Sequence, residues 1–338
     1  MSTHVFVELA SDLPGASLGR VVFELFTDRT PLASENFRRL CVDDGEQSYR
    51  GTRLHRVVRG LLIGGGDIVN GDGRGAWSIY GTDIFDDDPE RIEVDRAGLL
   101  CTATLGKPNT NTCQFFISMA PAAHLTSQTI VFGRVAHGMD VLRVIERMET
   151  LPNERPIYEV RIAHCGQCKV DWSAPVDPLD PYPGFPEDHP EVLEISDKME
   201  ISHAVRQLGN DLFWKGEFEL SLRKYDKALK YLEEDLLATP EEEELLMDAR
   251  VTCWLNQALA WTRIGRYQEA IGILDTVLHH RPGNVKAVRR REIAVEALKM
   301  GDREALPKVV RTHAFRPAPR PFLLSRRRLT LYEKPLLE

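Results

Sequence analysis

The sequence predicts two different folds in one chain, a closed antiparallel β-barrel capped by helices at its ends and an all-helical repeat superhelix. Three observations support this. Short strand-like runs fill the chain up to about residue 168, an acidic proline-rich stretch follows, and helical units then recur at a period of about 34 residues. A length of 338 residues fits two domains of roughly 100 to 200 residues each. The predicted segments are a barrel domain (1–169), a linker (170–197), a repeat domain (198–312) and a basic tail (313–338).

The barrel domain alternates strand signals with two helix signals. Thr30 and Pro31 predict a helix start, with Thr30 as N-cap and the proline in the first turn. The second helix is expected at 139–148. The predicted strands are 5–9, 19–26, 54–58, 61–63, 98–102, 115–119, 131–135 and 158–164. Barrel closure is the expected arrangement because it removes exposed strand edges.

Composition and charge exclude several functional classes. Hydrophobic residues make up 43% and charged residues 28%, as in ordinary globular proteins, and a net charge of −8 argues against general nucleic-acid binding. No apolar run is long enough to span a membrane, and the start lacks a signal-peptide pattern. We therefore expect no nucleic-acid partner, no membrane partner and a location in the cytosol or nucleus.

The six cysteines are scattered through apolar segments, which is typical of reduced thiols. Cys165 and Cys168 form the only CxxC pair. A single pair without a nearby histidine at ligand spacing is a weak zinc signal, so two packed thiols are the favoured interpretation.

The linker combines nine acidic side chains and six prolines between residues 170 and 200, which predicts a semi-rigid acidic connector. Two repeat units follow near 202–235 and 251–284, with small residues Gly209 and Ala258 where paired helices approach closely. Thr239 with the following glutamates predicts a helix start. A third, less regular unit begins near residue 284, and the arginine-rich tail is expected to be solvated.

Several runs of the first domain resemble the cyclophilins, a family of peptidyl-prolyl isomerases. The matching runs are 19–26, 35–38, 49–52, 78–81 and 131–135, together with 54–58, 64–67 and 108–116. The resemblance implies an eight-stranded barrel with two capping helices and an enzyme that needs neither metal nor cofactor.

Arg56 is the candidate catalytic residue. Rotation about an X-Pro bond faces a barrier of about 18 to 20 kcal/mol, and the proline nitrogen regains a lone pair in the twisted state. A fixed guanidinium donor aimed at that nitrogen would bind the transition state selectively. The alternative for an arginine in this position is an ordinary surface ion pair.

The resemblance also implies a substrate groove. Phe116 would form the floor of the proline pocket, Leu125 its wall, and Gln114 a donor to the substrate backbone, with Ala103 beside the groove and His55 at its edge. The apolar members could equally be plain core residues, and His55 a satisfied polar neighbour. Two further pocket positions hold leucine where the family has phenylalanine and methionine, and a third holds histidine in place of the tryptophan that contacts cyclosporin A: Leu61, Leu62 and His124.

Gly64 is the most consequential departure from the family pattern. A typical cyclophilin has a glutamine there that buttresses the catalytic arginine. Without that neighbour Arg56 would be less well positioned, at a cost of about tenfold in rate per 1.4 kcal/mol. We therefore expect reduced isomerase activity and weak cyclosporin A binding.

The glycine-rich run from Gly64 to Gly75 is not a phosphate-binding loop, because no GK[ST] and no long helix follow it. Asp67, Asn70 and Asp72 also lack the spacing of a calcium loop. We expect no metal site.

A second candidate site lies in the repeats. Arg206 and Asn210, and likewise Lys286 and Arg290, are four residues apart and share a helix face, with Asn256 on the corresponding helix between them. Cations and amides together suit a peptide that ends in a free carboxylate. The group resembles the dicarboxylate clamp of tetratricopeptide domains that bind the acidic C-terminus of heat-shock protein 90. The alternative is a solvated polar face.

The complete arrangement resembles the cyclophilin-40 group of chaperone-associated isomerases. This implies a co-chaperone that docks on heat-shock protein 90 and acts on proline-containing client proteins. The alternatives are a non-catalytic peptide-binding adaptor of the chaperone machinery and a scaffold for a different acidic C-terminus.

Overall fold

The computed structural model divides the chain into two compact units, Met1–Ala260 and Trp261–Glu338. It describes residues 3–12, 18–42, 45, 47–169, 180–189, 191–233 and 238–300. The predicted basic tail (313–338), the end of the third repeat and residues 170–179 of the predicted linker lie outside the described residues.

Eight antiparallel strands form one sheet in the first unit. They are β1 (Thr3–Ser11), β2 (Gly19–Leu25), β3 (Arg56–Val58), β4 (Leu62–Gly65), β5 (Leu99–Thr104), β6 (Asn111–Ser118), β7 (Val131–His137) and β8 (Val160–Gln167). Their order across the sheet is β3-β4-β6-β5-β7-β2-β1-β8. The predicted strands are therefore confirmed, with ends that differ by a few residues.

The expectation of a closed barrel is corrected, because β3 and β8 do not pair and the strand ladder is a half-barrel. The residues that precede β3 lie against β8 instead. Gly51 N donates to Ile162 O (2.7 Å), Ile162 N to Thr52 O (2.9 Å) and Leu54 N to Val160 O (2.9 Å). This contact ends before the three-residue β3 begins, so β3 remains an edge strand.

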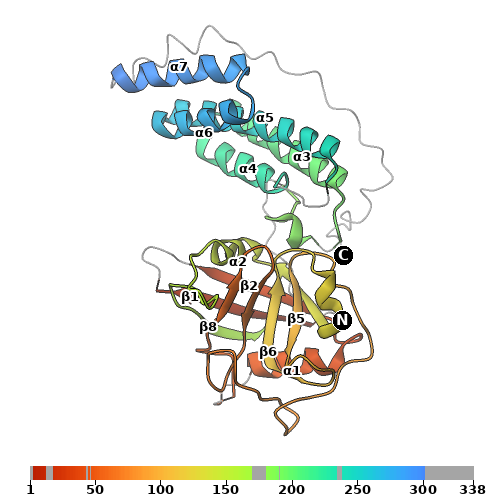
Figure 1. The fold of residues 1–338 in the computed structure, drawn as a ribbon. Coiled ribbons are helices and arrows are strands. Elements are labelled where there is room, and N and C mark those ends of the chain that lie inside the picture. Colours follow the sequence, from red (N-terminus) through yellow and green to blue (C-terminus); the bar gives the residue numbers. More distant parts are fainter. Residues whose placement is uncertain are drawn as a thin grey trace, which may run out of the picture. The chain divides into compact units, whose positions relative to one another are not determined.

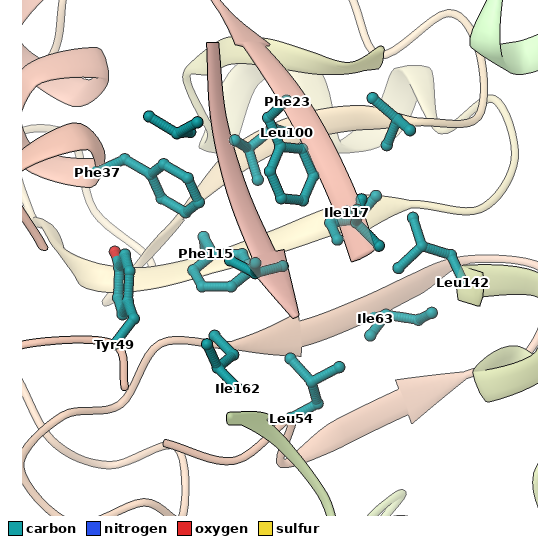
Figure 2. Packing of buried hydrophobic residues seen from close by; sticks show 14 of the residues in the cluster. Phe23, Phe37, Tyr49, Leu54, Ile63, Leu100, Phe115, Ile117, Leu142 and Ile162 are labelled. Carbon is teal, nitrogen blue, oxygen red and sulfur yellow. The ribbon is translucent and has the colours of Figure 1, made fainter. Parts of the chain in front are cut away.

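The main core lies on the concave side of this sheet. Phe37, Tyr49, Phe115 and Phe132 pack around one another, with ring centroids 5.1 to 5.4 Å apart. Figure 2 shows the rings of Phe37, Tyr49 and Phe115 together with aliphatic side chains of the same cluster, including Leu54, Ile63 and Ile117. Burial of apolar area at roughly 25 cal/mol per Å² makes this cluster the main source of stability for the sheet.

The first helix, α1 (Pro31–Val42), begins where predicted but is capped differently. Asp88 accepts hydrogen bonds from Leu32 N (3.0 Å) and Ala33 N (2.9 Å) through its two carboxylate oxygens. The Thr30 hydroxyl instead donates to Phe26 O (3.3 Å). The prediction of Thr30 as the side-chain cap is therefore wrong, since a carboxylate 55 to 56 residues away satisfies these N–H groups.

The second helix, α2 (Met139–Glu146), also has a distant cap. Asp188 Oδ1 accepts a hydrogen bond from Met139 N at 3.1 Å. Burial raises the pKa of Asp188 to about 7, helped by the charges of Asp140 and Glu187 and opposed by its backbone donors. The two helices lie at opposite ends of the sheet (Figure 1).

The part of the predicted linker that the structure describes is packed. Phe185 belongs to the main core cluster, and Glu187 forms an ion pair with Arg143 at 2.5 Å. Asp180 is fully buried and forms ion pairs with Lys224 and Lys227. Residues 180–189, called the strap below, are therefore held in place by packing and ion pairs on both the sheet side and the side of Lys224 and Lys227.

The strap contains the short helix η2 (Pro186–Asp188), and longer helices follow it in the first unit. They are α3 (Ile195–Trp214), α4 (Phe218–Lys230) and α5 (Pro240–Ile264), which continues into the second unit. Gly209 supplies the expected close approach, because a Cβ there would lie 2.6 Å from the Tyr225 ring. Thr239 and Glu242 form the predicted start of α5, each accepting a hydrogen bond from the other's backbone N–H.

The second unit contains α6 (Tyr267–His280) and α7 (Val285–Met300). Ala270 and Ile271 of α6 pack against Ala294 of α7. Small residues at this contact allow the two helices to approach closely. The helices of both units are consistent with the predicted helical repeats.

Candidate functional site

An apolar patch lies on the face of the sheet opposite the main core. Along β6, Phe115 and Ile117 belong to the main core, whereas Phe116 belongs to a second cluster with Leu62. This follows from the period of two in a strand. Leu61 of the β3–β4 turn and Leu125 of the short helix η1 (Ala123–Gln128) pack against it. Four predicted pocket residues therefore meet in one cluster.

Arg56 lies at the edge of this patch, and strand register sets its position. Arg56 of β3 pairs with Gly64 of β4, and Gly64 pairs with Phe116 of β6. Paired residues in neighbouring antiparallel strands have side chains on the same face. The row Arg56–Gly64–Phe116 thus places a cation and an aromatic ring on one face, with no side chain between them.

The Arg56 side chain is 51% exposed and is held by one carboxylate. Its Nε donates to Glu154 Oε2 at 2.6 Å. Glu154 lies 98 residues further along the chain, and no sequence pattern predicts this contact. The expectation that Arg56 lacks a hydrogen-bonding neighbour is corrected by the ion pair.

Asp67 organises the loop on the other side of β4. Its Oδ1 accepts hydrogen bonds from the backbone N–H groups of Val69 and Asn70. Its Oδ2 accepts four more, from residues 72 to 75, at 2.8 to 3.1 Å. Burial alone would raise the pKa of Asp67, but these donors outweigh it and lower the pKa well below the ordinary range.

This loop in turn positions Gln114. The side chain is only 8% exposed, and its Nε2 donates to Gly75 O at 2.6 Å. One N–H of the amide is thereby used within the protein, and an amide group has a second. The predicted donor to substrate backbone is therefore fixed by the loop that Asp67 holds.

His55 is half-buried between β3 and the same loop. Burial lowers its pKa, although Asp67 and Asp72 act in the opposite direction. The ring lies close to Gly73, where a Cβ would be 2.8 Å from His55 Cδ2. Its Nδ1 is buried without a hydrogen-bond partner among the described residues.

The remaining groove candidates lie in different environments. Ala103 is half-buried on β5, whereas His124 is exposed on η1. Their predicted roles in the groove stay predictions.

Two clamp candidates of the first unit, Asn210 and Asn256, are in contact with each other. Asn210 Oδ1 on α3 accepts hydrogen bonds from Asn256 Nδ2 on α5 and from the Tyr225 hydroxyl, both at 2.9 Å. Arg206 lies one turn before Asn210 on α3 and is half-buried. Lys286 and Arg290 lie one turn apart on α7, in the second unit.

Among the described residues, no group of three or more His, Cys, Asp or Glu side chains could hold a metal ion. Cys165 and Cys168 are unbridged thiols. In the same residues, no helix has the length and apolar character needed to cross a membrane.

Comparison with known proteins identifies the family. The model of the family "cyclophilin type peptidyl-prolyl cis-trans isomerase/CLD" matches residues 10–167. "Peptidyl-prolyl cis-trans isomerase D" of Eremothecium gossypii is 35% identical over 309 residues, which cover 84% of this chain and 83% of that protein. The protein of the same name from Mycosarcoma maydis is 37% identical over 250 residues, 68% of this chain and 62% of its own length.

The match to the Eremothecium gossypii protein spans 309 residues, so it extends beyond β8 into the helices that follow. This extent fits the cyclophilin-40 type of chain. The eight-stranded antiparallel sheet with its two helices α1 and α2 agrees with this assignment. The chain therefore belongs to the cyclophilin-type peptidyl-prolyl cis-trans isomerases.

Proposed function

We propose that the patch around Phe116 binds the proline ring of an X-Pro segment and that Arg56 is the catalytic donor. The observation that carries this is the strand register, which sets Arg56 beside the patch with only Gly64 between them. Two strand spacings of about 4.8 Å separate Arg56 from Phe116. That is wide enough for a proline ring to lie between the cation and the aromatic ring.

The chemistry follows from the twisted transition state. When amide resonance is lost, the proline nitrogen becomes a hydrogen-bond acceptor, and a guanidinium N–H beside it stabilises the twisted state more than either planar state. The bond to Glu154 uses Nε, so the terminal nitrogens of Arg56 can face the substrate. Gln114 would bind a substrate carbonyl with its second N–H and so keep the segment in register.

We further propose that turnover is lower than in cyclophilins with glutamine at the position of Gly64. The ion pair with Glu154 is exposed, and exposed pairs typically contribute only about 0 to 1 kcal/mol. It therefore positions Arg56 less firmly than a neighbouring side chain in the sheet would.

A protease-coupled assay on a proline peptide tests the catalytic role. Arg56→Ala is expected to lower kcat/KM by about 100-fold, the usual scale for one transition-state donor. Arg56→Lys should restore little, because a lysine lacks the planar fork. Unchanged turnover in Arg56→Ala would reject Arg56 as the catalytic donor, and background-level turnover in the wild type would favour a peptide-binding adaptor.

A second function, docking on the acidic C-terminus of heat-shock protein 90, is supported by the contact between Asn210 and Asn256. Two amide side chains from separate helices meet there, next to Arg206. Amides and guanidinium groups are suited to a terminal carboxylate and acidic side chains. Docking would bring the isomerase to proline-containing client proteins of the chaperone.

Calorimetric titration with the acidic C-terminal pentapeptide of heat-shock protein 90 tests this docking. Lys286→Ala and Asn210→Ala are each expected to weaken binding about tenfold, with a matched control at Lys215, which is exposed at the end of α3. Equal weak binding by wild type and both variants would reject the clamp. Clear binding of a different acidic C-terminus would instead support another partner.

A further inference from the structure

We infer that Glu154 is a positioning residue for Arg56 and takes the place of the side chain that Gly64 lacks. The inference rests on the proposed catalytic role of Arg56. The two side chains are joined by the hydrogen bond from Arg56 Nε to Glu154 Oε2 at 2.6 Å. An Nε contact fixes the plane of the guanidinium, because all of its nitrogens lie in that plane.

The backbone keeps Glu154 next to β3. Val57, the residue after Arg56, donates its N–H to Glu154 O at 2.7 Å. Glu154 N in turn donates to Leu151 O (2.9 Å), and Leu151 N donates to Arg155 O (2.8 Å). Side chain and backbone of Glu154 therefore contact two consecutive residues of β3, which defines both its distance and its orientation.

Glu154 adopts an unusual backbone conformation to do this. Its φ is +65°, in the left-handed region that glycine and asparagine prefer. A residue with a Cβ is strained in this region, because the Cβ lies too close to the following carbonyl oxygen. Such strained residues cluster at functional positions, and here the strained residue is the one whose side chain bonds Arg56.

Gly64 leaves the other side of Arg56 open. An ideal Cβ at Gly64 would lie 3.4 Å from Arg56 Cβ, at ordinary contact distance, so a side chain there would lie directly against the arginine. A polar group could therefore hold Arg56 either from position 64 on β4 or from the loop beyond the edge strand β3. In this chain the loop residue Glu154 bonds Arg56, and position 64 has no side chain.

The solvent exposure of the ion pair sets how strongly Glu154 can position Arg56. The Arg56 side chain is 51% exposed and that of Glu154 is 44% exposed, so water screens the pair. Loss of the carboxylate is expected to lower kcat/KM about fivefold, with little change in KM. The folded state loses no buried contact.

A set of variants in the full chain tests this inference. Glu154→Ala should lower kcat/KM about fivefold, and Glu154→Gln, which keeps an acceptor oxygen, should recover most of it. Gly64→Gln in the Glu154→Ala background should restore turnover. The matched control is Glu149→Ala, since Glu149 is an exposed acid of the same loop whose backbone carbonyl, rather than its side chain, bonds Ile157.

A spectroscopic measurement separates positioning from general stability. The Nε–H resonance of Arg56 in ¹⁵N-labelled protein should shift in Glu154→Ala and return towards its original position in Glu154→Gln, with unchanged thermal unfolding. If Arg56→Ala lowers turnover but Glu154→Ala does not, the inference about Glu154 is wrong while the catalytic role stands. Lost turnover that Gly64→Gln fails to rescue would also overturn it, whereas unchanged turnover in Arg56→Ala would reject the catalytic role itself.

Discussion

Two carboxylates hold the two sides of the groove in opposite ways. Asp67 is 2% exposed and is bonded by six backbone N–H groups of its own loop. The Glu154 side chain is 44% exposed and bonds one side chain, that of Arg56, across 98 residues of sequence. The side that carries Gln114 is therefore built into the fold, whereas the position of Arg56, the proposed catalytic donor, depends on a solvent-exposed contact.

The difference matters because the two kinds of contact respond to different changes. Removing a buried acceptor on which several backbone N–H groups depend costs folding free energy, since each of these donors loses its partner. Removing one exposed charge costs little stability but changes where a side chain points. Mutations on the Asp67 side should thus appear in stability, and mutations on the Glu154 side in turnover.

The largest effect is expected for Asp67→Ala. Six N–H groups lose their acceptor, and we expect the free energy of unfolding to fall by about 3 to 5 kcal/mol. Urea denaturation measures this, with Asp72→Ala as control because Asp72 is a more exposed acid of the same loop. An equal loss in both variants would remove the contrast between the two sides of the groove.

Glycine substitutions should show the next largest difference. A Cβ at Gly66 would lie 2.6 Å from the Phe115 ring and 2.7 Å from Cys113 O, and the backbone φ there is +85°. Gly66→Ala should therefore destabilise the protein by about 3 kcal/mol, whereas Gly64→Ala should cost less than about 0.5 kcal/mol. Thermal unfolding of the two variants makes the comparison, and similar melting temperatures would contradict it.

Acid and base titration extends the comparison to a third carboxylate. The pKa of Asp67 is lowered, so its contribution is present above the ordinary aspartate range and is lost as pH falls through its lower folded-state pKa. The pKa of Asp188 is raised to about 7, so stability is full below pH 4 and decreases as pH rises towards 7.

Asp188→Asn should therefore leave stability unchanged at pH 4 and raise it by about 2 kcal/mol at pH 8. Chemical denaturation at a series of pH values measures the effect. A variant that keeps the pH dependence of the wild type would assign that dependence to another group.

The smallest effect is expected from salt. Raising the ionic strength from 0.05 to 1 M screens the exposed pair of Arg56 and Glu154, and kcat/KM for an uncharged peptide should fall by less than about threefold. In Glu154→Gln this salt dependence should disappear. If kcat/KM of Glu154→Gln depended on ionic strength as strongly as that of the wild type, the salt dependence would come from another charged group.

Sequence patterns predicted all eight strands and the barrel helices, because alternation and apolar periodicity are local signals. Four apolar residues of the predicted groove also lie in one cluster, since strand period alone sends Phe116 to the face opposite Phe115: Leu61, Leu62, Phe116 and Leu125. Their role in a proline pocket stays a prediction. Those parts of the fold depend on short stretches of sequence and their immediate neighbours.

Contacts over long sequence distances could not be predicted in the same way. Asp88 and Asp188 cap helices from far along the chain, and Glu154 reaches Arg56 from a loop with no sequence motif. Each is one acidic residue among 51, and nothing adjacent to it in sequence distinguishes it. The missing pairing between β3 and β8 was not predicted, because closure of the barrel depends on the length of β3, which is only three residues.

Phe185 has a consequence for how this protein can be divided. Its ring is buried in the core of the sheet, and the next residues bond α2 and Arg143. A fragment cut after β8 would leave a hole in its own core and an uncapped helix, and it should unfold more easily than one that continues to residue 189. The core of the isomerase domain is thus completed by Phe185, which lies beyond residue 167, where the family match ends. The family match and the folding unit therefore end at different residues.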